Sequence, residues 1–174
     1  MVRRRARVIV WVLLAFGVLL VLSGALLAIA FPKLSLQWAE RSTDQCLSHL
    51  RRLSQAALAY AEDHSGYLPP AGVWMDALRP SLSASRDLRC PKFGSERDRY
   101  GYALNSEIAA RPLSRVAEPS RTFLLYDSAN LARNASDPVT TLPPEGRHRT
   151  KAGPGNNAAS ADGKVRFRPI HTSR

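Results

Sequence analysis

The sequence predicts an α+β protein in which one long N-terminal helix, first transmembrane and then a stalk, packs on a small antiparallel sheet. Three observations predict this class: an uncharged apolar run near the N-terminus, a helical stripe after it, and short strand-like runs confined to the C-terminal half. The length of 174 residues suits one domain with an appendage. No internal repeat is visible, which excludes a solenoid.

The N-terminus joins a basic segment, residues 1–7, to an apolar segment, residues 8–31. The first holds four arginines and the second holds 24 residues without a charge. As a helix, the apolar segment spans about 36 Å, more than a hydrocarbon core of about 30 Å. Arginines ahead of such a span place the N-terminus in the cytoplasm. We therefore expect a single-pass cell membrane protein with an extracytoplasmic domain, residues 33–174.

A cleaved signal peptide is the alternative for the apolar segment. Ala28-Ile29-Ala30 forms an A-x-A cleavage site at the end of the run. The apolar region of a signal peptide usually has about 7–15 residues, so the greater length here favours a retained anchor. Both interpretations place the remaining domain outside the cytoplasm.

A second helix is predicted over residues 36–62. Pro32 lacks a backbone N–H and should kink or break the helix before it. Steps of four and three residues put five side chains on one stripe: Cys46, Leu50, Leu53, Ala57 and Tyr60. Gly66 and the prolines that follow it end this helix.

The rest of the chain predicts one short helix and a few strands. The helix covers residues 74–78, and strand-like runs cover residues 100–104 and 122–126. Asp162-Gly163 suits the tight turn of a hairpin between residues 158–161 and 164–168. The polar or proline-rich segments between these elements, residues 83–99 and 128–156, are expected to be loops.

The order and content of several segments resemble a known family. These are CLSHLRRLSQAALAYAEDHSGYLPP (46–70), WMDAL (74–78), LRCP (88–91), YGYALNS (100–106), RTFLLYDSA (121–129) and RH…GNNAASADGKV (147–165). The chain resembles the type IV pilins and type II secretion pseudopilins, in the bacterial branch with a C-terminal signature of His, about nine residues, then Asp-Gly. The resemblance implies a structural or accessory protein of a secretion or pilus-type system, with other pseudopilins or secretion machinery as partners. It implies no enzymatic activity and no cofactor.

The chain departs from this family at both ends. Aligned on Pro32, the glycine of the prepilin cleavage site falls on Val10, and the glutamate five residues later falls on Ala15. In the family, the peptidase requires that glycine and the glutamate helps to assemble the filament. We therefore expect no prepilin processing. The signature is also longer, since 13 residues separate His148 from Asp162.

Cys46 and Cys90 are the two cysteines of the chain. Extracytoplasmic domains with two cysteines commonly pair them, so we expect a disulfide. In the chain-entropy model, closing such a loop contributes about 3–5 kcal/mol. The alternative is two separate thiols, with Cys46 as a core residue of its stripe.

No metal site is predicted, and the weak candidates for one are His148 and Asp162. Calcium needs six to eight oxygen ligands, and few carboxylates lie nearby. A transition metal would want more than one imidazole, and the other histidines are not at ligand spacing: His49, His64 and His171. The simpler interpretation is that His148 bonds loop backbone and Asp162 shapes the turn.

No catalytic residue is predicted either. Asp127, Ser128 and His148 have the residue types of a hydrolase triad. The chain has no G-x-S-x-G elbow, however, and the order of these residues predicts no activity.

The basic surplus, a net charge of +11, supports a second function. Six residues near the C-terminal hairpin are candidates for one patch: Arg147, Arg149, Lys151, Lys164, Arg166 and Arg168. Such a patch attracts nucleic acid or acidic polysaccharide, so the alternative function is an anchored or secreted binding module for acidic polymers. A solvated basic face is the simpler interpretation.

Overall fold

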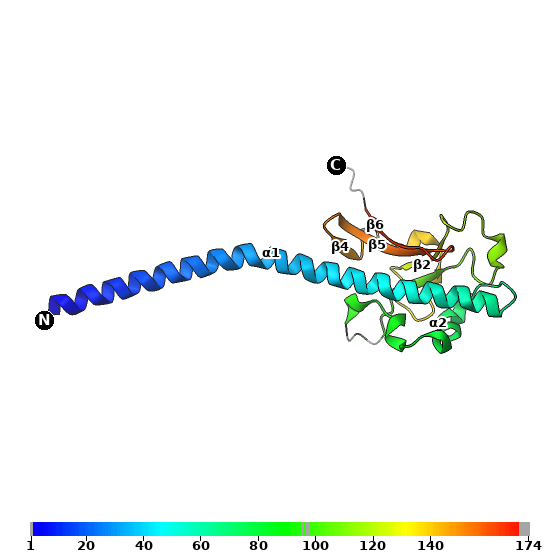
Figure 1. The fold of residues 1–174 in the computed structure, drawn as a ribbon, viewed down its shortest axis with the longest axis horizontal. Helices are drawn as coiled ribbons and strands as arrows, with labels where there is room; N and C mark the ends of the chain where they lie inside the picture. Colours follow the sequence, from blue (N-terminus) through cyan, green and yellow to red (C-terminus); the bar gives the residue numbers. More distant parts are fainter. Residues whose placement is uncertain (1, 95, 97, 171–174) are drawn as a thin grey trace. The chain divides into compact units, whose positions relative to one another are not determined.

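The structure is a computed structural model that describes residues 2–94, 96 and 98–170. It confirms the α+β class: one long N-terminal helix and a six-stranded sheet (Figure 1). The chain forms two compact units, Met1–Trp38 and Ala39–Arg174. Helix α1, Val2–Asp63, contributes to both, and each unit is described by itself.

The first unit is the apolar part of α1. Its large side chains are exposed, with Trp11 at 70%, Val21 at 72% and Phe31 at 73%. Among the described residues, α1 is the one helix long and apolar enough to cross a membrane, with a mean hydropathy of 2.7 over its most apolar stretch. Exposure of this kind excludes a buried core helix in the described chain and is compatible with a single-pass membrane anchor.

Of the kink or break expected at Pro32, the break is wrong, because α1 continues through this residue. Proline removes one backbone donor, but good helix formers on both sides favour continuation. The backbone acceptor that loses its partner is the Ala28 carbonyl, four residues before the proline.

The second unit begins with the predicted stripe of α1. Cys46, Leu50 and Leu53 are fully buried and Ala57 is 1% exposed, whereas Tyr60 is half-buried at the edge of the core. The helix ends after Asp63, where Gly66 adopts a φ of +85°. A left-handed glycine is a common way to end a helix.

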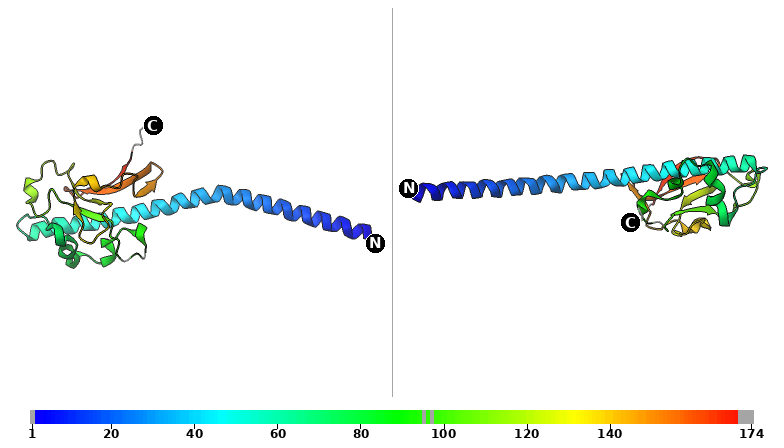
Figure 2. Two further views of the ribbon diagram at one scale, coloured as in Figure 1. Left: turned by 180° about the vertical axis from the view of Figure 1, so that it is seen from behind. Right: turned by 90° about the horizontal axis from the view of Figure 1, so that it is seen from below.

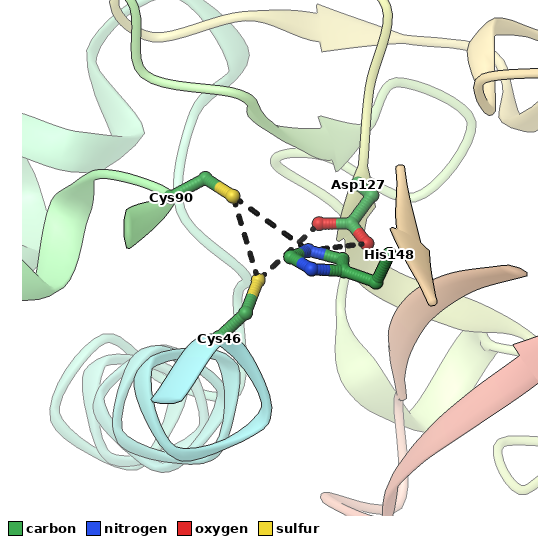
Figure 3. Close-up of side chains that lie close together, drawn as sticks. All are labelled: Cys46, Cys90, Asp127 and His148. Carbon is green, nitrogen blue, oxygen red and sulfur yellow. Dashed lines mark hydrogen bonds and ion pairs between the residues drawn. The ribbon is translucent and has the colours of Figure 1, made fainter. Parts of the chain in front are cut away.

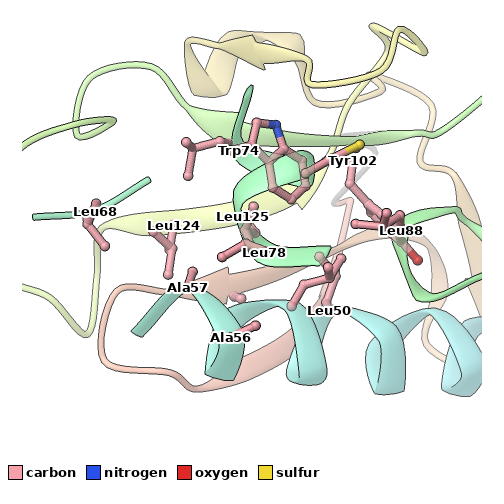
Figure 4. Packing of buried hydrophobic residues seen from close by; sticks show 14 of the residues in the cluster. Leu50, Ala56, Ala57, Leu68, Trp74, Leu78, Leu88, Tyr102, Leu124 and Leu125 are labelled. Carbon is pink, nitrogen blue, oxygen red and sulfur yellow. The ribbon is translucent and has the colours of Figure 1, made fainter. Parts of the chain in front are cut away.

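A short helix covers the other side of this core. Helix α2, Trp74–Leu78, buries Trp74, Met75 and Leu78 against the stripe (Figure 4). The indole N–H of Trp74 donates to the Ala135 carbonyl at 2.9 Å, so its polar atom is satisfied. Between Arg79 and Gly101, the helical elements among the described residues are 3₁₀ turns: Arg79–Ser81, Ser85–Leu88 and Pro91–Phe93.

The sheet is mixed rather than wholly antiparallel. Its strands are β1 (Tyr102–Asn105), β2 (Phe123–Asp127), β3 (Ser136–Asp137), β4 (His148–Thr150), β5 (Gly153–Ser160) and β6 (Val165–Pro169). Their order is β3-β1-β2-β5-β4, with β6 also paired to β5. Only β1 and β3 pair in parallel. Strands β3, β4 and the start of β5 lie in the segment 128–156 that was expected to be a loop.

Strand β5 organises the C-terminal part of the sheet (Figures 1 and 2). Gly155 pairs with His148 of β4 on one side and with β6 on the other. Ala158 pairs with Tyr126 of β2 and again with β6 on the other side. Strands β2 and β4 therefore follow each other along the same edge of β5. The end of β2 and the start of β4 meet beside residues 156–157.

The predicted hairpin is present as β5 and β6. Gly163 in its turn has a φ of +82°, which favours glycine. Val165 and Phe167 are half-buried, while Arg166 and Arg168 are exposed. The expected alternation along the second strand is thus confirmed.

Candidate metal centre

Four side chains from four separate segments converge in the core of the second unit (Figure 3). They are Cys46 on α1, Cys90 just before the turn Pro91–Phe93, Asp127 at the end of β2 and His148 at the start of β4. One sulfur, oxygen or nitrogen atom from each lies within 4.8 Å of all the others. All four residues are buried, His148 most exposed at 4%.

Several donor atoms of the cluster lie 3.5–3.8 Å from one another. The two Sγ atoms are 3.8 Å apart. Cys90 Sγ lies 3.6 Å from Nε2 of His148, which lies 3.5 Å from Oδ2 of Asp127. Cys46 Sγ lies 3.5 Å from Oδ1 of the same carboxylate.

The fold explains why these residues meet. Cys46 belongs to the buried stripe of α1, and Asp127 and His148 adjoin because β2 and β4 share one edge of β5. The backbone N–H of Cys90 donates to the Tyr100 carbonyl at 2.8 Å, which holds the loop beside the start of β1.

Two further residues contact the cluster. The Tyr102 hydroxyl lies 3.0 Å from Cys46 Sγ, and the backbone N–H of Asn157 donates to Asp127 Oδ2 at 2.6 Å. The side-chain amide of Asn157 is also buried, and neither its nitrogen nor its oxygen has a hydrogen-bond partner in the described part of the chain. Buried polar atoms are nearly always paired, so this amide indicates a missing neighbour.

The environment changes the protonation of the four groups. Burial raises the pKa of the Cys46 thiol well above its usual value. Hydrogen bonds from Cys46 and His148 outweigh burial at Cys90 and lower the pKa of its thiol to about 5. Burial opposes a charge on His148, but Asp127 and Cys90 outweigh it and raise the pKa of the ring to about 9. The lowered pKa favours the thiolate of Cys90, the form that binds metals.

The arrangement does not match a nucleophilic triad. In a Cys–His–Asp triad the imidazole uses one nitrogen for the nucleophile and the other for the carboxylate. Here the same nitrogen, Nε2 of His148, faces both Cys90 and Asp127. Donor atoms that converge on one point suit a shared cation.

The structure brings together the two cysteines expected to pair, but as thiols. Their separation of 3.8 Å compares with about 2.05 Å in a disulfide, so the bond stays a prediction. Of the two weak metal candidates, only His148 joins the cluster. Asp162 instead pairs with Lys164 at 2.9 Å in the hairpin turn.

The other histidines lie elsewhere. His49 bonds the Arg89 carbonyl at 2.9 Å, and His64 stacks on Tyr60. His171 lies outside the described residues. Sequence reasoning named Asp127 only among the residue types of a hydrolase triad and did not consider it as a metal ligand. The pairing of β2 and β4 with the same edge of β5 brings it beside His148.

The predicted basic patch loses one member. Arg147 is 7% exposed, and its guanidinium donates to the carbonyls of Gly101 and Ser128 and lies over the Phe93 ring. The other five side chains are exposed: Arg149, Lys151, Lys164, Arg166 and Arg168. Polymer binding itself stays a prediction.

A cavity of about 930 Å³ lies beside Cys90. Its lining includes five arginines: Arg52, Arg79, Arg86, Arg89 and Arg133. These arginines add to the positive charge of this unit.

No family model, curated protein or solved structure matches this chain. The likeness to pseudopilins therefore rests on the chain's own segments.

Proposed function

We propose that the protein is a membrane-anchored, pseudopilin-like structural or accessory subunit of a secretion or pilus-type system. The observation that supports this most is the character of α1. One helix of 62 residues carries exposed apolar side chains in its first part and core side chains in its last part. Such a helix suits both an anchor and a stalk.

In this proposal the N-terminus lies in the cytoplasm and the second unit lies outside. The four arginines before the apolar run favour this orientation. The subunit keeps its apolar helix without prepilin processing, because Val10 stands where the family has its cleavage-site glycine. Assembly partners would meet the protein through the helix or the second unit.

The test is to isolate the full chain from the membranes of its host after crosslinking. We expect an intact N-terminal peptide, resistance to alkaline extraction, and copurified pseudopilins or secretion components. A chain that begins at Phe31 and remains soluble would contradict the anchor. A retained anchor without such partners would contradict the role in a secretion or pilus-type machine.

A binding module for acidic polymers is the second candidate. The exposed basic residues of β6 and the arginine-lined cavity favour it. The test is a titration of the full chain in detergent with DNA and with an acidic polysaccharide at two salt concentrations. We expect affinity that falls with salt, and weaker binding by the variant Arg166→Glu/Arg168→Glu. Equal binding by this variant and the parent chain would contradict the patch.

A further inference from the structure

We propose that Cys46, Cys90, Asp127 and His148 bind one zinc ion that holds the second unit together. The proposal is independent of the function proposed above. It depends on the positions of the four donor atoms, on their chemistry and on their burial. It replaces the expected disulfide, because both require the same two sulfur atoms.

The donor atoms have spacings close to those of a tetrahedral zinc site. With Zn–S near 2.3 Å and Zn–N or Zn–O near 2.1 Å, tetrahedral edges are about 3.8 Å for S–S, about 3.6 Å for S–N and S–O, and about 3.4 Å for N–O. The observed distances are 3.8 Å between the two sulfurs, 3.6 Å from Cys90 Sγ to His148 Nε2, 3.5 Å from Cys46 Sγ to Oδ1 of Asp127 and 3.5 Å from His148 Nε2 to Oδ2 of Asp127. The last two distances end on different oxygens of one carboxylate, so a single donor oxygen accounts for three matching edges, and one donor atom from each of the four residues lies within 4.8 Å of the others.

The donor set selects zinc among common ions. Calcium and magnesium take oxygen ligands, and an iron–sulfur cluster of the usual type takes four cysteines. Two thiolates, one imidazole and one carboxylate are all ordinary zinc ligands, and zinc accepts them in a tetrahedron. A transition metal therefore needs no second imidazole at this site, because the two sulfurs supply the other ligands.

The site is closed, which indicates a structural ion. Cys46 and Asp127 have no exposed surface, and Cys90 is 2% exposed. The protein supplies all four positions, so no position is left for water or substrate. The ligands come from α1, the loop before β1, and two strands, and one ion would fasten all four segments.

Two groups around the four ligands fit this assignment. The Tyr102 hydroxyl lies 3.0 Å from Cys46 Sγ, within reach to donate a hydrogen bond to a Cys46 thiolate. The N–H of Asn157 orients the Asp127 carboxylate. Zinc with two thiolates and a carboxylate has a net charge of −1, and these two donors stabilise that charge. The side-chain amide without a hydrogen-bond partner in the described chain belongs to this same residue, Asn157.

The first experiment measures metal and thiol state in the same full-length preparation. The protein is purified in detergent from cells grown with zinc, without reductant or chelator. We expect one zinc per chain by elemental analysis and by native mass. After denaturation with chelator, both cysteines should react with an alkylating agent without reductant. Replacement by Co²⁺ should give the visible absorption of a tetrahedral cobalt–thiolate site.

Variants then test each assigned ligand. Cys46→Ser and Asp127→Asn should lose most zinc and the tetrahedral cobalt spectrum, and Tyr102→Phe should weaken zinc binding about 10-fold to 100-fold. The matched controls Asp162→Asn and His64→Gln change the same residue types outside the cluster. They should retain one zinc per chain.

A Cys46–Cys90 disulfide in the parent chain, with no bound zinc, would overturn the proposal. So would zinc that survives the double change Cys46→Ser/Cys90→Ser, or loss of zinc in the Asp162→Asn control. Because the metal content, thiol state and cobalt spectrum of the parent chain need no variant, the test holds even if a ligand variant fails to fold.

Discussion

The buried carboxylate of Asp87 should make Arg52 one of the most important polar residues for stability. Asp87 is 1% exposed. Nε and Nη2 of Arg52 donate to its two oxygens at 2.7 and 2.8 Å, and Nε2 of His49 lies 3.5 Å away. This ion pair fastens the turn Ser85–Leu88 to α1. Asp87 lies three residues before Cys90 in the sequence. We therefore expect Arg52→Met to destabilise the second unit.

The magnitude follows from the geometry of the pair. Removing one partner of a buried ion pair costs about 3–5 kcal/mol, since the other charge stays buried. The Arg52 side chain is 40% exposed, so water can replace part of the lost interaction. His49 also remains beside the carboxylate. We expect Arg52→Met to lower the free energy of unfolding by about 2–3 kcal/mol. This value lies at the upper end of the usual contribution of a hydrogen bond to a charged group.

The assay is urea unfolding of the full chain in detergent, followed by near-ultraviolet circular dichroism. Arg51→Met is the matched control, because Arg51 is the neighbouring exposed residue on the same helix and should change stability by less than about 0.5 kcal/mol. The double change Arg52→Met/Asp87→Leu should recover part of the loss, because it removes the unpaired charge. Equal stability of Arg52→Met and Arg51→Met would refute the reasoning.

Three further changes test the core, the sheet and the anchor. Leu50→Ala should cost about 2–5 kcal/mol in the same urea assay, because Leu50 has no exposed surface; a loss below 1 kcal/mol would contradict its place in the core. Gly155→Ala should disturb β6 and speed its amide exchange, because a Cβ there would clash with the Arg168 carbonyl oxygen, whereas Gly72→Ala meets no described atom within 4 Å and should leave exchange unchanged. Leu20→Arg puts a charge near the middle of the apolar run at a cost of about 2.5–3.5 kcal/mol, and the protein should leave the alkali-resistant membrane fraction if this run is an anchor.

Local sequence patterns predicted the elements that are determined by residues a few positions apart. The steps of four and three through Cys46, Leu50 and Leu53 identified the buried face of α1 because helical periodicity is a short-range property. Asp162-Gly163 identified the β5–β6 hairpin because its turn needs a residue with positive φ. Both predictions depended on residues a few positions apart.

The missed elements depend on partners far away in sequence. Strand β3 has two residues, and β4 consists of His148-Arg149-Thr150, a polar run without strand character. Both form because a neighbouring strand offers an edge. Pro32 shows the opposite case: a strong local signal for a helix break is outweighed by helix formers on both sides.

The residues of the candidate site were noted in the sequence, but not as one cluster. Composition singled out the two cysteines, and the C-terminal signature singled out His148. Asp127, which ends an apolar strand, was noted only as a residue type of a hydrolase triad. It becomes a ligand only because β2 ends where β4 begins along β5.

A disulfide would use two of the four clustered side chains, whereas a zinc ion would use all four. A bond between Cys46 and Cys90 would leave Asp127 and His148 as a buried ion pair with no other task, and buried pairs often stabilise less than apolar residues of the same size. Zinc gives all four side chains a role and gives the Tyr102 hydroxyl a thiolate to contact. It also fastens the segment around Cys90, which follows the 3₁₀ turn Ser85–Leu88 and precedes the 3₁₀ turn Pro91–Phe93, to α1 and the sheet. The convergence of four donors on one point therefore favours the metal over the covalent bond.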